Sequence, residues 1–370
     1  MKFDDRPFIA IWETTQACDL ACRHCRASAH PGRDSDELDT LEGKRLLTRF
    51  ADAHVPLVVL TGGDPAKRPD LIELVRHAKS VGLTLGLTPS ATPLVTGELV
   101  AELAAAGLSR LAVSIDAPDA ATHDAFRGVE GSFDLACRIL EDARRHGIAT
   151  QINTSIHSGN IDALADMAPL VRELGAVLFS VFFVVPTGRA EARMLPTAER
   201  VETALELLAD MAEREPFAVK TTAAPHYRRV LAERKRAHGA AAEHGTHGRA
   251  GVRVNDGRGF LFVSHRGRVF PSGFLPLDCG SVRERDVMEI YREHPLFQSL
   301  RRPELLAGKC GACEWAAVCG GSRARAYAVT GDALEWDPLC AYVPRGYAHY
   351  ARDLERRAQA EARALPVLSA

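Results

Sequence analysis

The sequence predicts an α/β protein built around a parallel sheet, because short apolar segments alternate with amphipathic helical patterns from about residue 8 to residue 185. Glycine follows several of the helical patterns, as is common where helices end. Strand–helix units that repeat in this way form parallel sheets with right-handed crossovers. Periodicity alone leaves two architectures open, a barrel and a doubly wound open sheet.

The individual elements follow from the same patterns. The predicted strands cover residues 8–13, 57–61, 83–88, 110–115, 150–155 and 177–184, with a strand-like segment at 217–221. Helical patterns lie near 41–53, 69–81, 95–106, 132–147, 160–173 and 197–213, and a further one near 286–300. Residues 259–270 alternate like a hairpin around Arg266 and Gly267. We therefore expect a first domain at 1–230, a flexible connector rich in Gly, Ala and His at 231–258, and a second domain at 259–370 that ends in a helix.

Composition narrows the class of protein. A chain of 370 residues suits one large domain and a second module. The net charge of −2 gives no electrostatic reason to expect nucleic acid or an anionic membrane as a partner. The chain shows neither a long apolar stretch nor the apolar segment of a signal peptide, so we expect a cytoplasmic protein. Cytosolic cysteines stay reduced, and seven of the nine here fall into two tight groups, which favours metal binding.

The first group is Cys18, Cys22 and Cys25, in the spacing Cys-x3-Cys-x2-Cys. Three thiolates leave one iron of a four-iron cluster without a protein ligand, whereas such clusters normally take four cysteines. The alternatives are a tetrahedral zinc site with a distant fourth ligand, or three unrelated buried thiols. Zinc sites usually add a second cysteine pair about 12 to 20 residues on, and none follows here.

This motif resembles that of the radical S-adenosylmethionine (SAM) enzymes, in which the amino and carboxylate groups of SAM chelate the open iron. The resemblance implies a partial (β/α)6 TIM barrel, with the cysteine loop after the first strand on the active face. It also implies reductive cleavage of SAM to a 5′-deoxyadenosyl radical, which removes hydrogen from a substrate carbon. A flavodoxin- or ferredoxin-like protein is the expected electron donor.

A second motif, Gly62-Gly63-Asp64-Pro65, follows the second predicted strand. Paired glycines let the backbone approach a ligand closely, although Gly-Gly alone is also typical of a plain strand-to-helix turn. The segment resembles the Gly-Gly-Glu-Pro motif that binds the methionyl amino group in the family, with Asp64 in place of Glu. The resemblance extends the SAM site to polar residues at later strand ends, which are otherwise typical of caps or surface pairs: Ser114, Asp116, Arg127 and Asn153.

The second cysteine group contains four thiols, Cys310, Cys313, Cys319 and Cys340, enough to close a cluster or a structural zinc site. The stretch resembles the SPASM or twitch extension of radical SAM enzymes. Ser272 and Ser322 stand where related sequences often have cysteine. We therefore expect one auxiliary four-iron cluster rather than two. Two cysteines remain: Cys137, expected to be a buried thiol, and Cys279, a remnant ligand or a substrate-facing thiol.

Resemblance covers roughly residues 8–345, and within the SPASM group the sequence looks most like the branch that acts on heme precursors. That branch includes the coproheme decarboxylase and the enzyme that trims propionates during synthesis of d-type heme. Modification of a ribosomal peptide is the alternative enzymatic function. The alternative without enzymatic activity is an iron–sulfur electron carrier or scaffold. Such a protein would not need the Gly62-Gly63-Asp64 motif.

Two residues after the strand-like segment at 217–221 are candidates for substrate chemistry. His226 and Tyr227 follow Pro225, which restricts the preceding residue to an extended conformation. In one interpretation they face the substrate as an acid–base or positioning pair. In the other they are packing residues between the barrel and the extension.

Overall fold

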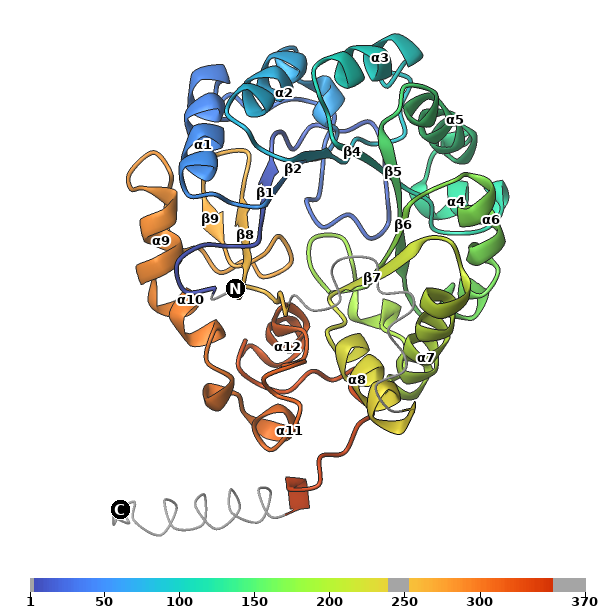
Figure 1. Ribbon diagram of the computed structural model, residues 1–370, viewed down its shortest axis with the longest axis vertical. Helices are drawn as coiled ribbons and strands as arrows, with labels where there is room; N and C mark the ends of the chain where they lie inside the picture. The colour runs from blue at the N-terminus through green and yellow to red at the C-terminus, as the bar shows by residue number, and fades with distance from the viewer. Residues whose placement is uncertain (1–2, 239–252, 349–370) are drawn as a thin grey trace, which may run out of the picture.

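The computed structural model describes residues 3–238 and 253–348. In this part of the chain nine strands form one sheet in the order β7-β6-β5-β4-β3-β2-β1-β8-β9. The strands curl into an incomplete ring, and α1 to α7 lie outside it (Figure 1). The strands are β1 (Ile9–Glu13), β2 (Leu57–Thr61), β3 (Leu85–Leu87), β4 (Arg110–Ser114), β5 (Ala149–Ile156), β6 (Leu178–Phe183), β7 (Ala218–Thr222), β8 (Phe260–Val263) and β9 (Val269–Phe270).

Helices follow the strands as the amphipathic patterns predict. In α1, for example, Asp39 caps the first turn, and its carboxylate and the Glu42 side chain form a reciprocal capping box. The helices are α1 (Thr40–Asp52), α2 (Leu71–Ser80), α3 (Gly97–Ala105), α4 (Ala120–Arg127), α5 (Ser132–Arg145), α6 (Met167–Glu173), α7 (Ala198–Arg214), α8 (His226–His238), α9 (Val287–Glu293), α10 (Pro295–Leu300), α11 (Gly308–Gly311) and α12 (Arg323–Thr330).

The partial barrel predicted from the cysteine motif is confirmed. Every neighbouring pair from β1 to β7 is parallel, and consecutive strands lie side by side. The sheet is larger than six units, because β7 joins one edge and β8 pairs in parallel with β1 at the other. β8 and β9 form the predicted antiparallel hairpin around Arg266 and Gly267, and Gly267 has the positive φ of +77° that its turn requires.

Other boundaries differ from the expectations. Residues 231–238 belong to α8 rather than to a connector, because Arg234 pairs with Glu206 and Asp210 of α7. Residues 239–252 of that segment, and the helix expected at the C-terminus, lie outside the described residues. The helix expected near 286–300 is two helices, divided at His294 before Pro295. The described residues contain no helix with the length and apolar character needed to cross a membrane.

Side chains alternate between the core and the interior of the barrel. On β2, Val58 and Leu60 are buried in the main apolar core beneath the helices, whereas Val59 and Thr61 line the interior. On β1, Trp12 is in the core and Ile11 lines the interior. This period of two is the one expected of strands that bury one face, and it determines which residues can meet a ligand inside the barrel.

Candidate active site

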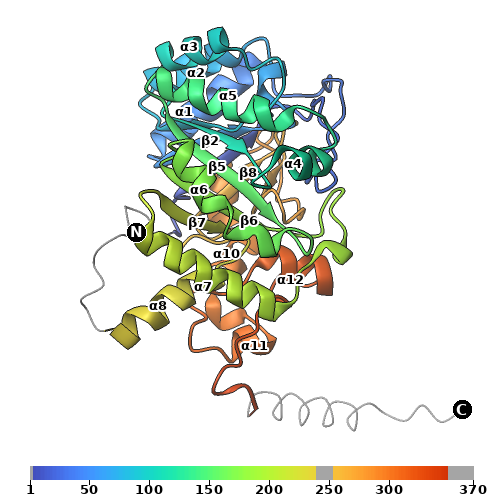
Figure 2. The same ribbon diagram turned by 90° about the vertical axis from the view of Figure 1, so that its right-hand side faces the viewer.

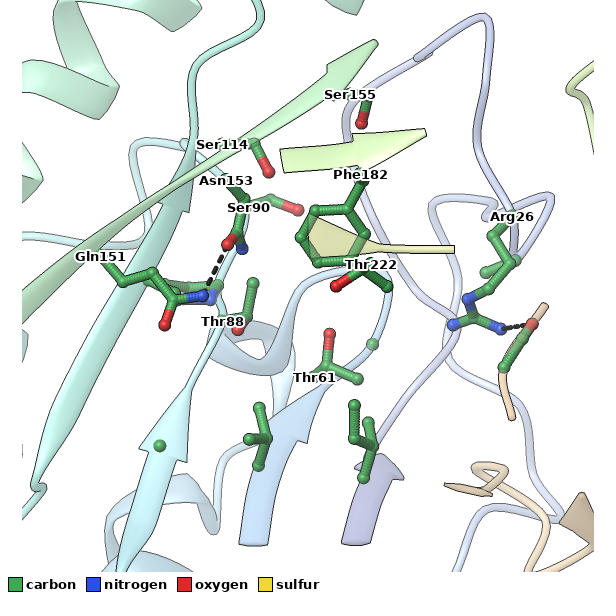
Figure 3. Close-up of a pocket in the computed structure, with 18 of the residues that line it drawn as sticks. Arg26, Thr61, Thr88, Ser90, Ser114, Gln151, Asn153, Ser155, Phe182 and Thr222 are labelled. Carbon is green, nitrogen blue, oxygen red and sulfur yellow. Dashed lines mark hydrogen bonds between the residues drawn. The ribbon is translucent and has the colours of Figure 1, made fainter. Parts of the chain in front are cut away.

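The interior of the barrel holds a cavity of about 340 Å³. Residues from β1 to β8 line it, together with the loop after β1. Figure 3 shows side chains from several strands around this common space, among them Thr61, Ser114, Asn153 and Thr222. The cavity therefore lies where the active sites of TIM-type barrels are built.

The cysteine loop forms one wall of the cavity. Cys18, Cys22 and Cys25 all line it. The backbone N–H of Leu20 donates to Cys18 Sγ at 3.4 Å, that of Ala29 donates to Cys25 Sγ at 3.4 Å, and Arg127 Nη1 donates to Cys22 Sγ at 3.7 Å. Donors directed at sulfur stabilise thiolates, so this donor set fits an iron–sulfur cluster.

Arg189 holds the cysteine loop in place from the other side of the barrel. Its Nε donates to the carbonyl oxygen of Cys22 at 3.0 Å, and its Nη1 donates to that of Ala29 at 3.1 Å. The backbone N–H of Arg189 donates to the carbonyl oxygen of Cys25 at 2.9 Å. The segment after β6 therefore fixes a loop that lies about 160 residues earlier in the chain.

The Gly62-Gly63 turn packs directly against the cysteine loop. Gly63 N–H donates to the carbonyl oxygen of Thr15 at 2.8 Å. A Cβ at Gly62 would lie 2.4 Å from the same oxygen, and a Cβ at Gly63 would lie 2.4 Å from that of Ala17. Only glycine allows this approach. Both glycines line the cavity, so the turn presents bare backbone to a ligand.

Asp64 occupies a different place from the one expected. Its carboxylate is fully buried and does not line the cavity. It accepts from Thr92 Oγ1 at 2.6 Å and from the backbone N–H groups of Ala66 and Ser90 at 3.1 and 3.3 Å. Burial raises the pKa of this carboxyl. In this structure Asp64 braces the glycine turn against the loop after β3, rather than offering its carboxylate to a ligand.

Gly63→Ala is expected to weaken binding of SAM, the ligand that the resemblance implies, roughly 10- to 100-fold, because the added Cβ would displace the cysteine loop and local overpacking costs about 1–3 kcal/mol. Equilibrium dialysis of SAM against the reconstituted protein measures the effect. Gly97→Ala is the matched control, since its Cβ would meet only Asp142 at an ordinary 3.5 Å. Equal SAM affinities in the two variants would contradict the role given to the turn.

Asp116 and Arg127 form a buried pair at the edge of the cavity. Arg127 Nε donates to Asp116 Oδ2 at 2.6 Å, and Ser155 N–H donates to the other carboxylate oxygen at 2.7 Å. Burial favours the neutral carboxyl, but the Arg127 charge, the neighbouring His24 and the hydrogen bond from Ser155 together outweigh it and lower the pKa of Asp116. Arg127 lines the cavity and Asp116 does not. Asp116 therefore positions Arg127, which is the member of the pair that faces a ligand.

Ser114 and Asn153, the strand-end residues predicted for the SAM site, both line the cavity. They are register partners on β4 and β5. The side chain of Gln151 donates to Asn153 Oδ1 at 2.7 Å, which orients the Asn153 amide (Figure 3). The structure thus brings Ser114, Asn153, Arg127 and the glycine turn to one cavity with the three cysteines.

The second cysteine group lines a smaller cavity beside α8: Cys310, Cys313, Cys319 and Cys340. Trp315 N–H and Gly321 N–H each donate to a cysteine sulfur at 3.4 Å, and Arg323 Nη2 lies 3.6 Å from Cys310 Sγ. Burial raises the pKa of Cys340 to about 12 in the metal-free protein. Among the described residues no three His, Cys, Asp or Glu side chains converge on a single metal ion. Each thiolate of a four-iron cluster binds a different iron, so cysteines that surround a cavity fit that group.

His226 and Tyr227 do not line the central cavity. His226 is buried beside the second cysteine group, 3.3 Å from Asp337 Oδ2 but without hydrogen-bond geometry. Burial lowers the pKa of His226 to about 4. Tyr227 donates to the carbonyl oxygen of Leu208 in α7 at 3.3 Å. Their placement corrects the first interpretation: they pack between the barrel and the extension, at the end of the molecule where α7, α8, α11 and α12 gather (Figure 2).

The two cysteines outside both groups and the two serines noted in the sequence pack within the fold. Cys279 is buried in the main core with its Sγ near the carbonyl oxygen of Leu277, so it faces neither cavity. Cys137 of α5 is half-buried and packs against the same core. Ser322 caps α12 by accepting from Arg325 N–H, and Ser272 is buried.

The sequence alone did not reveal two features of the cavity. His24, between two of the cysteines, stacks on Phe126 of α4 with 4.3 Å between ring centroids, and Phe126 stacks on His157. Burial lowers the pKa of His24 to about 3. The second feature is a set of basic side chains that line the cavity: Arg26 of the cysteine loop, Arg110 of β4 and Lys220 of β7.

Comparison with known proteins places this chain in a family. The Radical SAM superfamily model matches residues 12–171. The AdoMet-dependent heme synthase of Nitratidesulfovibrio vulgaris is 41% identical over 341 residues, covering 91% of this chain and 93% of the relative. That of Methanosarcina barkeri is 40% identical, with coverage of 91% and 97%. The PqqA peptide cyclase of Rhodopseudomonas palustris is 30% identical, with coverage of 91% and 88%.

The fold has solved counterparts as well. The structure of Streptococcus suis SuiB bound to SAM aligns with a TM-score of 0.71 and 16% identity, covering 91% of this chain and 78% of that one. Radical SAM proteins bind a four-iron cluster and SAM, and the cysteines and the glycine turn described above fit both. The chain is an enzyme of the radical SAM superfamily.

Proposed function

We propose that this enzyme removes hydrogen from a carboxylate-bearing side chain of a tetrapyrrole in the synthesis of heme. The observation that carries the proposal is the identity of 40–41% with AdoMet-dependent heme synthases over 91% of the chain. The cavity supports it. Among the described residues, its lining includes Arg26, Arg110, Arg127 and Lys220 and no Asp or Glu. Glu13 and Asp116, behind the lining, pair with Arg26 and Arg127. Such a lining suits an anionic substrate.

The proposed cofactor site uses the residues that meet at the central cavity. Cys18, Cys22 and Cys25 hold the four-iron cluster through their thiolates. The backbone of Gly62 and Gly63 receives the methionyl end of SAM, and Arg127 pairs with its carboxylate by a charge-assisted hydrogen bond. When bound, the cluster and SAM together supply a radical able to abstract hydrogen from an unactivated carbon.

The chain's own residues prepare the site for that chemistry. The apolar wall of Ile11, Val59 and Phe262 excludes water from the space beside the cysteine loop. Ser114 and Asn153 are proposed to hold the ribose by hydrogen bonds. Asp116 keeps Arg127 charged and directed at the cavity. Binding of substrate and SAM in one enclosed space brings the reacting carbon close to the radical without a diffusional step.

The second cysteine group is proposed to hold one auxiliary four-iron cluster. Four cysteines around one cavity, and the backbone N–H groups that donate to their sulfurs, support this ligand set. By the resemblance to SPASM proteins, Ser272 and Ser322 stand where related sequences often have the cysteines of a further cluster. A flavodoxin- or ferredoxin-like protein is the proposed source of the low-potential electron.

Modification of a ribosomal peptide is the second candidate, favoured by the 30% identity with a PqqA peptide cyclase. An experiment can distinguish the two functions by identifying which molecule, a tetrapyrrole or a peptide, stimulates SAM cleavage.

Anaerobic protein with dithionite and SAM is expected to form 5′-deoxyadenosine slowly alone and faster with iron coproporphyrin III. The substrate stimulates cleavage because it closes the cavity and consumes the radical in productive turnover. Liquid chromatography measures 5′-deoxyadenosine over time, with free heme as the matched control that carries fewer propionates. Stimulation by a cysteine- or tyrosine-containing peptide, with none by the tetrapyrrole, would contradict the proposal.

A further inference from the structure

Inward-facing positions on four neighbouring strands share one row of the sheet. Ser114 pairs with Asn153, Asn153 with Ser180, and Ser180 with Lys220. Adjacent strands lie about 4.8 Å apart, so the row runs for about 10 Å from Asn153 to Lys220. Its first half belongs to the proposed SAM site. Its second half, on β6 and β7, has no role in the function proposed above.

Ser180 has an unsatisfied hydroxyl in this row. The residue is fully buried, and its Oγ has no hydrogen-bond partner among the described residues. Leu178 and Phe182, two positions away on either side, line the cavity, so Ser180 points to the same face of β6. Ser180 itself is covered by its neighbours and is not part of the lining, so a ligand reaches its hydroxyl only if these side chains shift. Buried hydroxyl groups are nearly always hydrogen-bonded, because an unpaired one loses its contact with water without compensation. A polar ligand group next to Ser180 would supply the missing partner.

Lys220, next to Ser180 on β7, brings a positive charge to the same place. It lines the cavity, as does Thr222 one row further along β7. Val59 on β2 and Phe262 on β8 add apolar side chains to the lining, with the Arg26 guanidinium 4.7 Å from the centre of the Phe262 ring. A ligand that fits this lining has an apolar body and an anionic group directed at β6 and β7.

We propose that Lys220 and Ser180 form a subsite for a carboxylate of the substrate, which Lys220 pairs with by charge and Ser180 by a hydrogen bond. The inference rests on the proposed function and deepens it, because it assigns the residues that select the substrate side chain. A carboxylate held here lies in the same row as Ser114 and Asn153. The side chain that carries it is therefore the one presented to the SAM site.

The test is binding of iron coproporphyrin III and of its tetramethyl ester to the reconstituted full-length protein, followed by Soret absorbance. The wild type should bind the acid about 10- to 100-fold more tightly than the ester, as expected for a charged hydrogen bond. Iron coproporphyrin III has four carboxylates, and Arg26 and Arg110 also line the cavity. Lys220→Met should therefore lower the preference for the acid about 10-fold without abolishing it, and Lys220→Arg should restore most of it. Ser180→Ala should lose about threefold to tenfold in affinity for the acid. Arg193→Met, which removes an exposed cation, is the control and should behave as the wild type.

Unchanged affinity of Lys220→Met for the ester shows that its cavity is intact. Retention of the full wild-type preference for the acid by Lys220→Met would overturn the inference. Lys220→Met could instead lose SAM affinity and keep its preference for the acid. That result would also overturn the inference, because Lys220 would then bind the methionyl carboxylate of SAM. If the wild type binds neither porphyrin, the proposed function is overturned and the subsite with it. This result is distinct from the two above, in which the wild type binds the acid.

Discussion

Replacement of Cys18, Cys22 and Cys25 together by Ala is expected to abolish reductive cleavage of SAM, down to the level of a protein-free control. All three thiols line the central cavity, and the described residues place no other cysteine there. The wild type should hold about eight irons per chain after anaerobic reconstitution, and the triple variant about four. Iron and acid-labile sulfide assays measure the loss, and liquid chromatography measures 5′-deoxyadenosine.

Cys137→Ala is the control for this experiment, because Cys137 lies on α5 away from both cavities. It should keep about eight irons and full cleavage activity. Cleavage of SAM by the triple variant would contradict the assignment of the cluster. If the wild type contained only four irons and held zinc in the four-cysteine site, the assignment of an auxiliary cluster to that site would be wrong.

Asp337→Asn is expected to cause the largest loss of stability. Asp337 and Arg325 are both fully buried and form a two-point ion pair at 2.8 and 2.9 Å. Arg325 also donates to the carbonyl oxygens of Val184 and Ala223, which follow β6 and β7. The pair therefore joins the extension to the barrel. Removing one charge leaves the other buried without compensation, which costs about 3–5 kcal/mol.

Denaturant unfolding of the metal-free variants, followed by tryptophan fluorescence, measures this difference in the free energy of unfolding. Glu191→Gln is the control, because Glu191 and Arg193 form an ion pair that is 54% and 78% exposed. Exposed pairs contribute about 0–1 kcal/mol, so this variant should unfold close to the wild type. Equal stability of the two variants would mean that Asp337 and Arg325 do not join the two parts of the molecule.

The sequence predicted the cysteine loop, the glycine turn and most strands because each depends on local spacing. β2, for instance, spans the residues expected from its apolar pattern. α4 was not predicted, because it has only eight residues and buries only His123, which is too short an apolar face to recognise in the sequence. The first residues of the expected connector are helical because they pair with α7, a contact that the sequence of the segment does not reveal.

Side-chain direction was harder to predict than the elements themselves. Asp64 follows a strand end, as ligand-binding residues do, yet its carboxylate turns back to Thr92. His226 also follows a strand, but α8 begins at that residue and carries its ring toward the extension. Lys220, in contrast, lines the cavity but was not predicted to do so. Which face of a strand points into the barrel depends on how the sheet curls, and this is a property of all the strands together.

The most direct test of the proposed chemistry is transfer of deuterium from the substrate to 5′-deoxyadenosine. Iron coproporphyrin III deuterated at its propionate carbons is incubated anaerobically with the reconstituted enzyme, SAM and dithionite, and the nucleoside is analysed by mass spectrometry. Abstraction from the propionate predicts one deuterium in the 5′-deoxyadenosine that forms. Formation of 5′-deoxyadenosine without deuterium, at the rate seen in the absence of the tetrapyrrole, would contradict it.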